Sequence, residues 1–400
     1  MDLEYGPKYE AFRAEVRKFL SEQAASAPRG GIGYGGGART SREQVLAWQR
    51  TLIEHGYAAR TIPKKYGGAG RQADLLESII IEEEFARAGV SRGVAGQGPG
   101  MLVPTLLEHG SEEQKRKYVG PTIRGEMVWC QGYSEPGSGS DLASLQTRAV
   151  LDGDDFVING QKIWTSTARE ADMIFALVRT EPEAKKHEGI SYLVFSMETP
   201  GIEIRPLHTL TGNAEFNEVF FTDVRVPKSS LVGKRGEGWK IGNTTLRHER
   251  NMLGNSTQTE SLFASLVELM KSEGPAGTRA IDSPVLRDRL NRLEARVLAM
   301  KYHALRLLTC TLRGENPGVA GLIVKLEGCE LNHQIGALAL DALGELGPLH
   351  GSSAHARANG AWPSQWMFAL GLIIGGGTAQ IQKNIIAERG LGLPREPKAA

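Results

Sequence analysis

Apolar positions recur at helical spacing through most of the first 120 residues. Phe12 is followed by apolar residues four, seven and eight positions later (Val16, Phe19 and Leu20), which predicts one buried helix face. Ser41, with Glu43 and Gln44 just behind it, opens a second helix that ends at Gly56. A polar, glycine-rich stretch, Ala27–Gly37, separates the two and is expected to be a mobile loop. Further helices are expected over Leu75–Ala88, Pro104–Glu108 and Ser111–Tyr118, the last with Ser111 as N-cap and Gln114 at the capping-box position.

The pattern changes near Met127, where short β-branched and aromatic runs separated by turns begin and continue to Leu231. The segment TRAVLDGDDFVINGQKIWTS predicts three strands joined by two turns, one at Asp152–Gly153 and one at Asn159–Gly160. Residues 127–231 are therefore expected to form an all-β domain, either a barrel or a sandwich.

The helical period returns after Gly238 and lasts to the end of the chain. Ser283 followed by Pro284 is a favourable N-cap and N1 pair. We therefore expect an α+β fold with an N-terminal helical domain (1–126), the β domain (127–231) and a C-terminal helical bundle (232–400). The long C-terminal helices are predicted over Trp239–Glu273, Ser283–Arg313, Gly318–Leu343 and Thr378–Arg389.

Charge and cysteine content narrow the choice of function. The 400 residues carry 47 basic and 46 acidic side chains, so no overall positive field favours nucleic acid or an anionic membrane. Three cysteines without a C-x-x-C pair indicate neither a disulfide framework nor a zinc site, and no metal is expected. The chain shows no apolar run of signal-peptide or membrane-spanning length, which predicts a cytoplasmic protein.

Two glycine-containing motifs differ in what they indicate. Gly31-x-Gly33-x-x-Gly36 has the spacing of a dinucleotide fingerprint, but no strand precedes it, so a loop is favoured. The segment 132–141 (GYSEPGSGSD) concentrates glycines, serines and carboxylates between two strands. It is either a polar hairpin loop or a close backbone approach to a flat or anionic ligand. Trp164–Thr165–Ser166 is likewise either core or a contact with a conjugated ring.

These segments resemble, in order, those of the acyl-CoA dehydrogenase family. IPKKYGGAG is similar to the family's W-P-x-x-Y-G-G segment, and GYSEPGSGSDLA to its T-E-P-x-a-G-S-D flavin loop. NGQKIWTS resembles N-G-x-K-x-W-I-T, and GGGTAQIQKNIIAERGLG resembles the C-terminal E-G-T segment. EHGSEEQKRKYV, EFNEVFFTDVRVP and GEGW also have counterparts, so the resemblance spans nearly the whole chain.

The resemblance implies an FAD site formed by two parts of the chain. Residues of the glycine-rich loop should line the isoalloxazine and ribityl chain, Trp164 should stack near the ring, and Ser166 should bond near N5. Two residues of the C-terminal segment should reach the same cofactor. The implied cofactor-binding residues in these three places are Gln131, Tyr133, Ser134, Gly139, Ser140, Trp164, Ser166, Thr378 and Gln380.

The resemblance also implies the chemistry, which is α,β-desaturation of an acyl-CoA thioester to the trans-2-enoyl-CoA, with flavin N5 taking the β-hydride. The glutamate base of E-G-T is absent here, because Gly376 occupies its position. A second family solution places the base in an L-x-x-E-R segment, which implies that Glu249 of LRHER removes the α-proton. Gly376 then contributes an N–H to the thioester carbonyl. Arg250 and Ser140 are the other implied substrate-binding residues.

A further departure concerns assembly. Family homodimers carry an R-x-x-F-G arm for the neighbour's FAD pyrophosphate, whereas here Arg279 has no Phe-Gly after it, and Glu345 would bring a carboxylate towards phosphates. The chain looks most like the base-bearing subunit of bacterial steroid side-chain acyl-CoA dehydrogenases. This implies a homo- or hetero-tetramer through the C-terminal helices, where Leu322, Ile323 and Leu326 offer an apolar face, and electron-transfer flavoprotein as acceptor.

Two other functions stay open on the sequence. An acyl-CoA oxidase shares the fold and the base chemistry, and only the reaction with oxygen separates it from a dehydrogenase. A non-catalytic partner subunit is the second alternative, although Glu249 argues against it. The sequence leaves open whether the acyl group is fatty, branched or steroid, and so whether the enzyme serves fatty acid β-oxidation or steroid degradation.

Overall fold

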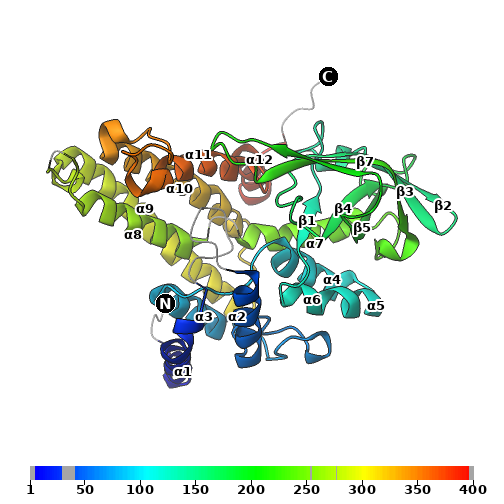
Figure 1. The fold of residues 1–400 in the computed structure, drawn as a ribbon, viewed down its shortest axis with the longest axis horizontal. Coiled ribbons are helices and arrows are strands. Elements are labelled where there is room, and N and C mark those ends of the chain that lie inside the picture. Colours follow the sequence, from blue (N-terminus) through cyan, green and yellow to red (C-terminus); the bar gives the residue numbers. More distant parts are fainter. Residues whose placement is uncertain (1–4, 29–40, 253–254, 276, 396–400) are drawn as a thin grey trace. The chain divides into compact units, whose positions relative to one another are not determined.

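A computed structural model describes residues 5–28, 41–252, 255–275 and 277–395 (Figure 1), and the side chains of residues 250–252 are outside this description. Most of the expected mobile loop Ala27–Gly37 also lies outside the described residues. The chain forms two compact units. The first comprises Met1–Thr209 with Asn213–His248, and the second Leu210–Gly212 with Glu249–Ala400.

The N-terminal part of the first unit is helical, as predicted. Ser41 accepts a hydrogen bond from the Gln44 N–H, and Ser111 and Gln114 form the predicted capping box. Both caps satisfy N–H groups that a helix start leaves without partners. The helices are α1 (Pro7–Gln23), α2 (Arg42–His55), α3 (Leu75–Ala88), α4 (Val103–His109), α5 (Glu112–Gln114) and α6 (Gly120–Ile123).

The middle of the chain forms one mixed sheet, whose strands follow the order β6-β7-β3-β2-β4-β5-β8, with β1 paired to β4. β1 and β2 both run parallel to β4, and the other pairs are antiparallel. The expected barrel or sandwich is thus realised as an open sheet rather than a closed barrel. The strands are β1 (Trp129–Gly132), β2 (Arg148–Asp152), β3 (Asp155–Lys162), β4 (Met173–Arg179), β5 (Ile190–Ser196), β6 (Ile202–Leu207), β7 (Phe216–Pro227) and β8 (Leu231–Val232).

The central strand β4 is buried on both faces of the sheet. In β4, Phe175 and Leu177 belong to a cluster with Leu102 and Leu106 of the N-terminal helical region. The alternate residues Ile174 and Ala176 belong to a second cluster formed by the strands themselves. This alternation fixes the register, since a slip of one residue would exchange the two faces.

The prediction of a turn at Asn159–Gly160 was wrong. β3 runs through both residues, and the register with β7 shifts between Ile158 and Gly160, which makes this position a β-bulge. Gly160 has φ +147°, a conformation that favours glycine, and the Asn159 amide pairs with Asp223 of β7. The Asp152–Gly153 turn between β2 and β3 is confirmed.

The second unit is a helical bundle whose core includes Leu266, Leu331, Ile335 and Trp362. The single helix predicted over 239–273 is two helices, the second of which is N-capped by Asn255. A helix that the sequence pattern did not predict, α11, is apolar around most of its circumference. No described helix is long and apolar enough to cross a membrane. The helices are α7 (Gly238–Met252, which begins in the first unit), α8 (Ser256–Lys271), α9 (Pro284–Leu312), α10 (Ala320–Leu343), α11 (Ala361–Ile374) and α12 (Ala379–Ile385).

Candidate active site

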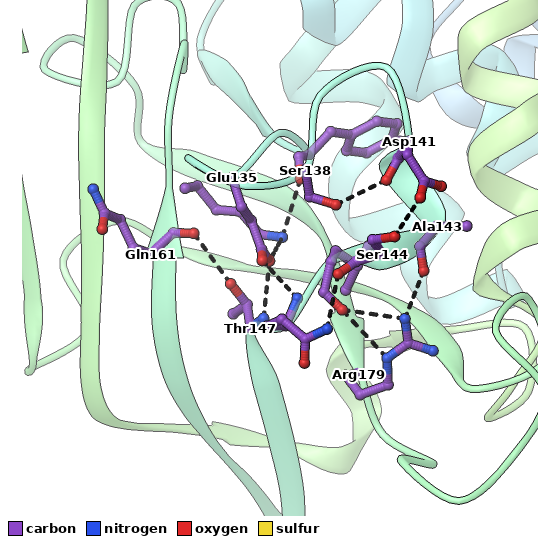
Figure 2. A network of polar contacts seen from close by, with 12 residues as sticks. Glu135, Ser138, Asp141, Ala143, Ser144, Thr147, Gln161 and Arg179 are labelled. Carbon is purple, nitrogen blue, oxygen red and sulfur yellow. Dashed lines mark hydrogen bonds and ion pairs between the residues drawn. The ribbon is translucent and has the colours of Figure 1, made fainter. Parts of the chain in front are cut away.

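A buried carboxylate near the start of the loop between β1 and β2 holds the two ends of that loop together. The Glu135 side chain, 8% exposed, accepts hydrogen bonds from the backbone N–H groups of Gln146 and Thr147 at 2.5 and 2.8 Å (Figure 2). The Lys162 ammonium at the end of β3 lies 2.7 Å from the same carboxylate and also donates to the Tyr133 carbonyl at 3.1 Å. The Glu135–Lys162 ion pair therefore contacts both the start and the end of the loop.

Burial and pairing act in opposite directions on these two groups. Burial lowers the pKa of the fully buried Lys162 ammonium to about 8, although Glu135 favours its charged form. Burial would raise the pKa of Glu135, but Lys162 and the hydrogen bonds from Thr147 and Gln146 outweigh it, so the pKa lies below its ordinary value. The loop is thus anchored by a charged carboxylate with three donors.

A second anchor holds the far side of the loop. The Arg179 guanidinium at the end of β4 donates to the carbonyls of Ala143 and Leu145, at 2.7 and 3.1 Å from Nη2 (Figure 2). Ser138 donates to the Asp141 carbonyl at 2.9 Å. Between the anchors, Gly137, Gly139 and Ser140 are exposed, and a Cβ built at Gly139 would meet no atom within 4 Å. The glycine backbone therefore adjoins open space.

The segment after β3 exposes an aromatic ring in an unusual backbone conformation. Trp164 has φ +61°, which is uncommon for a residue with a side chain, and is 58% exposed. Its ring meets Phe216 edge-on, with centroids 6.0 Å apart. Thr165 and Asn217 hold the segment by exchanging two backbone hydrogen bonds of 3.0 Å. Such strain commonly persists where a ligand is bound.

The predicted flavin residues of the first unit differ in how accessible their side chains are. Ser134, Gly139 and Ser140 lie on the anchored loop, and Gln131 precedes it at the end of β1. The ring of Tyr133 is only 4% exposed and packs edge-on against Phe175 and Tyr192. Tyr133 therefore has no ring surface for a flavin, and a contact from this residue must come from its backbone. Ser166 is half-buried next to Trp164.

In the second unit, the glycines 375–377 form a turn between α11 and α12. Gly376 and Gly377 have φ +63° and +96°. The Lys325 ammonium of α10 donates to the Ile373 and Gly377 carbonyls at 3.0 and 2.6 Å. Thr378, a predicted cofactor contact, is the N-cap of α12 and accepts from the Ile381 N–H, whereas Gln380 is exposed on α12.

Glu249 is half-buried on α7 and close enough to Lys325 to favour the charged form of that lysine. Lys325 thus contacts the turn that contains Gly376 and lies within electrostatic range of Glu249, and all three belong to the second unit. The side chain of Arg250 lies outside the described residues. Arg279 donates twice to Asp282, at 2.9 Å each, so its guanidinium is engaged locally.

The supporting residues were missed by sequence reasoning. Glu135 and Lys162 both occur in the segments that carry the resemblance, but they are 27 positions apart, and only the register of β3 brings them together. Arg179 and Lys325 lie outside those segments. No residue of the sequence signals that a lysine in the middle of a largely apolar helix reaches a turn 48 to 52 residues later.

Comparison with known proteins identifies the class of enzyme. Models of the acyl-CoA dehydrogenase N-terminal, middle and C-terminal domains match residues 6–126, 130–224 and 236–391. The chain therefore belongs to the acyl-CoA dehydrogenase family, as the sequence segments predicted. It is 39% identical to acyl-CoA dehydrogenase IpdE1 of Mycobacterium tuberculosis, over 97% of this chain and 99% of that protein.

Solved structures of relatives have the same fold. The ChsE4–ChsE5 complex from Mycobacterium tuberculosis is similar with a TM-score of 0.79 and 32% identity, covering 99% of this chain and 100% of that chain. The Tcur3481–Tcur3483 steroid ACAD gives a TM-score of 0.80 and 31% identity with the same coverage. The predicted architecture, an oxidoreductase acting on acyl-CoA and the use of FAD are confirmed by this membership.

Three observations on the first unit fit FAD. The exposed Trp164 ring offers a flat aromatic surface to a conjugated ring system. The Thr165 hydroxyl is buried without a hydrogen-bond partner among the described residues. Open space adjoins Gly139, so a ligand can approach the loop backbone closely. When bound, FAD supplies the hydride acceptor for acyl-CoA dehydrogenation.

Proposed function

We propose that this chain is the base-bearing subunit of an acyl-CoA dehydrogenase for steroid-derived acyl groups, and that Glu249 removes the α-proton. The observation that carries the base assignment is the position of Lys325, which donates to the carbonyls on both sides of the glycine turn and lies within electrostatic range of Glu249. The turn itself supplies no carboxylate, because its three residues are glycines.

The roles of the chain's own groups follow from this arrangement. The Gly376 N–H donates to the thioester carbonyl, which makes the Cα–H more acidic and stabilises the enolate-like charge. Glu249 accepts the Cα proton as a general base, which requires the carboxylate form and reach to Cα. Ser140 and Arg250 stay predicted substrate residues, and the anchored loop with Trp164 is the part of the first unit that we expect to position the cofactor. Arg279 reaches the cofactor pyrophosphate only after releasing Asp282.

The substrate class rests on the relatives. One solved relative is a steroid ACAD, and the similarity covers 99% of this chain and 100% of that one. We therefore expect a CoA thioester that carries a fused-ring steroid fragment, in preference to straight-chain fatty acyl-CoA.

The base assignment is tested by anaerobic flavin reduction in the FAD-loaded complex with a panel of straight-chain, branched and steroid-fragment thioesters. Glu249→Gln keeps the volume and removes the basicity, so reduction should slow by at least ~10²-fold. Glu330→Gln is the matched control, because Glu330 also lies near Lys325 but is assigned no proton transfer. Flavin reduction at the wild-type rate in the Glu249→Gln variant would place the base elsewhere.

We also propose that a different subunit completes the FAD site. Arg279 is held by Asp282, and no Phe-Gly follows it. Apolar side chains are exposed on the expected oligomer helices, with Leu298 and Tyr302 of α9 44% and 48% exposed and Ile323 of α10 38% exposed. These support assembly through the C-terminal helices. The solved ChsE4–ChsE5 relative is itself a complex.

Flavin stoichiometry tests this assembly. The chain expressed alone should bind less than one FAD, and co-expression with a subunit that carries the R-x-x-F-G arm should restore one FAD per unlike pair. A homo-oligomer with one FAD per chain and full activity would contradict the proposal. Electron-transfer flavoprotein as acceptor and the cytoplasmic location remain predictions.

A further inference from the structure

Lys325 is a buried cation that donates hydrogen bonds to backbone carbonyls. The residue is 3% exposed in the middle of the second unit's core helix α10. Taking an ammonium out of water is costly unless its donors are satisfied. Lys325 donates to two carbonyls, Ile373 at 3.0 Å and Gly377 at 2.6 Å. The lysine is therefore built into the fold rather than lying along its surface.

The two carbonyls lie on either side of the glycine turn. Ile373 is in the last turn of α11, where helix carbonyls lack intrahelical partners and carry the negative end of the dipole. Gly377 is the last glycine before the α12 N-cap, Thr378. Consecutive glycines without such anchors would have many accessible conformations. Because Lys325 fixes the turn at both ends, it also fixes the direction of the Gly376 N–H.

The predicted base, Glu249, lies within electrostatic range of the same ammonium. The charged and titratable groups near Lys325 include Glu249 on α7 and Cys329 and Glu330 on α10. Burial lowers the pKa of Lys325 below its ordinary value, even though these three neighbours favour its charged form. The attraction is mutual, so the cation stabilises the ionised carboxylate of Glu249.

We propose that Lys325 is a positioning residue that couples the two halves of the proton-abstraction site. It orients the Gly376 N–H for the thioester carbonyl and keeps Glu249 in the carboxylate form in which it can accept the α-proton. This inference rests on the proposed role of Glu249. The lysine touches neither substrate nor cofactor in this scheme and acts through the turn and the base.

Two substitutions separate the geometric role from the electrostatic one. Lys325→Gln retains a donor for the carbonyls but removes the charge, so the acid limb of the pH profile for flavin reduction should move to higher pH. Lys325→Arg retains the charge but has a wider, planar donor group. Its acid limb should stay in place while the rate at the pH optimum falls on the order of 10²-fold, because the Gly376 N–H is displaced.

The measurements use the FAD-loaded complex, and Lys383→Met serves as the control, since Lys383 is exposed on α12 next to the same turn. A readout independent of turnover is the affinity, measured by calorimetry between pH 5 and 9, for an α,α-dimethyl CoA thioester, which keeps the thioester carbonyl but has no α-proton to lose. Affinity should fall in both Lys325 variants and remain unchanged in the control.

The outcomes distinguish this inference from the one on which it rests. If Glu249→Gln reduces flavin normally, the base assignment fails. If Glu249→Gln is inactive but Lys325→Gln leaves the acid limb unchanged, only the role of Lys325 is overturned. Thermal unfolding of each variant is measured alongside. If Lys325→Gln does not fold, Lys325→Arg still tests the electrostatic role. An acid limb of its pH profile that moves to higher pH, although the charge is retained, overturns that role.

Discussion

Removing the Lys162 ammonium should destabilise the first unit and loosen the flavin loop. Lys162→Met keeps a chain of similar length and leaves Glu135 as a buried carboxylate that is 8% exposed. Removing one partner of a buried pair costs about 3–5 kcal/mol, because the remaining charge is uncompensated. Glu135 retains the N–H groups of Gln146 and Thr147 as donors. We therefore expect the lower end of that range, about 3 kcal/mol.

Urea unfolding at a fixed FAD concentration measures this loss, since bound ligand itself adds stability. With a denaturant slope of about 2 kcal/mol per M, a loss of ~3 kcal/mol lowers the midpoint by about 1.5 M. Lys186→Met is the matched control. Lys186 pairs with Asp141 on the same loop, but both side chains are largely exposed, so the loss should stay below about 1 kcal/mol.

The double substitution identifies the cause. If the unpaired charge of the Glu135 carboxylate is responsible, adding Glu135→Gln to Lys162→Met should restore part of the lost stability, although each single change is destabilising. A Lys162→Met protein within about 1 kcal/mol of wild type, or a double variant whose losses simply add, would refute the idea that this ion pair anchors the loop. FAD affinity should fall in parallel with stability.

Three further predictions concern backbone and pH. Gly376→Glu restores a carboxylate at the family's usual base position but at φ +63°, so it should cost about 1 kcal/mol or more in thermal unfolding and not rescue Glu249→Gln in flavin reduction. Gly160→Ala places a Cβ 2.7 Å from Thr147 at φ +147° and should cost about 1–3 kcal/mol in urea unfolding. The lowered pKa of Glu135 contributes stability that is present above about pH 4.3 and lost as pH falls through the folded-state value. Glu135→Gln should therefore flatten the unfolding midpoint between about pH 3 and 5, and an unchanged slope would contradict this.

Local signals in the sequence were sufficient for most helix starts and for the change from helix to strand. Ser41, Ser111 and Ser283 cap the helices that they were predicted to cap, because a short side-chain oxygen satisfies N–H groups next to it in the chain. α11 was missed because it is apolar around most of its surface and shows no helical period. The Asn159–Gly160 bulge was missed because its cause, the close approach of Thr147, lies 13 positions away.

In the candidate site, too, the features that lie in one continuous segment were predicted, and those that depend on distant residues were not. Loop, tryptophan segment and glycine turn were found because each is a continuous stretch with an unusual composition. The Glu135–Lys162 and Lys325–Gly377 contacts join residues 27 and 52 positions apart and depend on strand register and helix packing. The burial of Tyr133 was missed for a similar reason, since a residue after a strand can lie on either face.

The fluorescence of the exposed Trp164 ring provides a test of the predicted flavin contact. Three of the six tryptophans, Trp48, Trp129 and Trp362, are 2%, 2% and 7% exposed, whereas Trp164 is 58% exposed. Solvent-facing indole emits at longer wavelength and is reached by acrylamide, so the red part of the apoprotein fluorescence should come mainly from Trp164. A flavin covering that ring would quench this component by energy transfer and shield it from acrylamide. Fluorescence titration can thus follow occupancy of the site without any turnover.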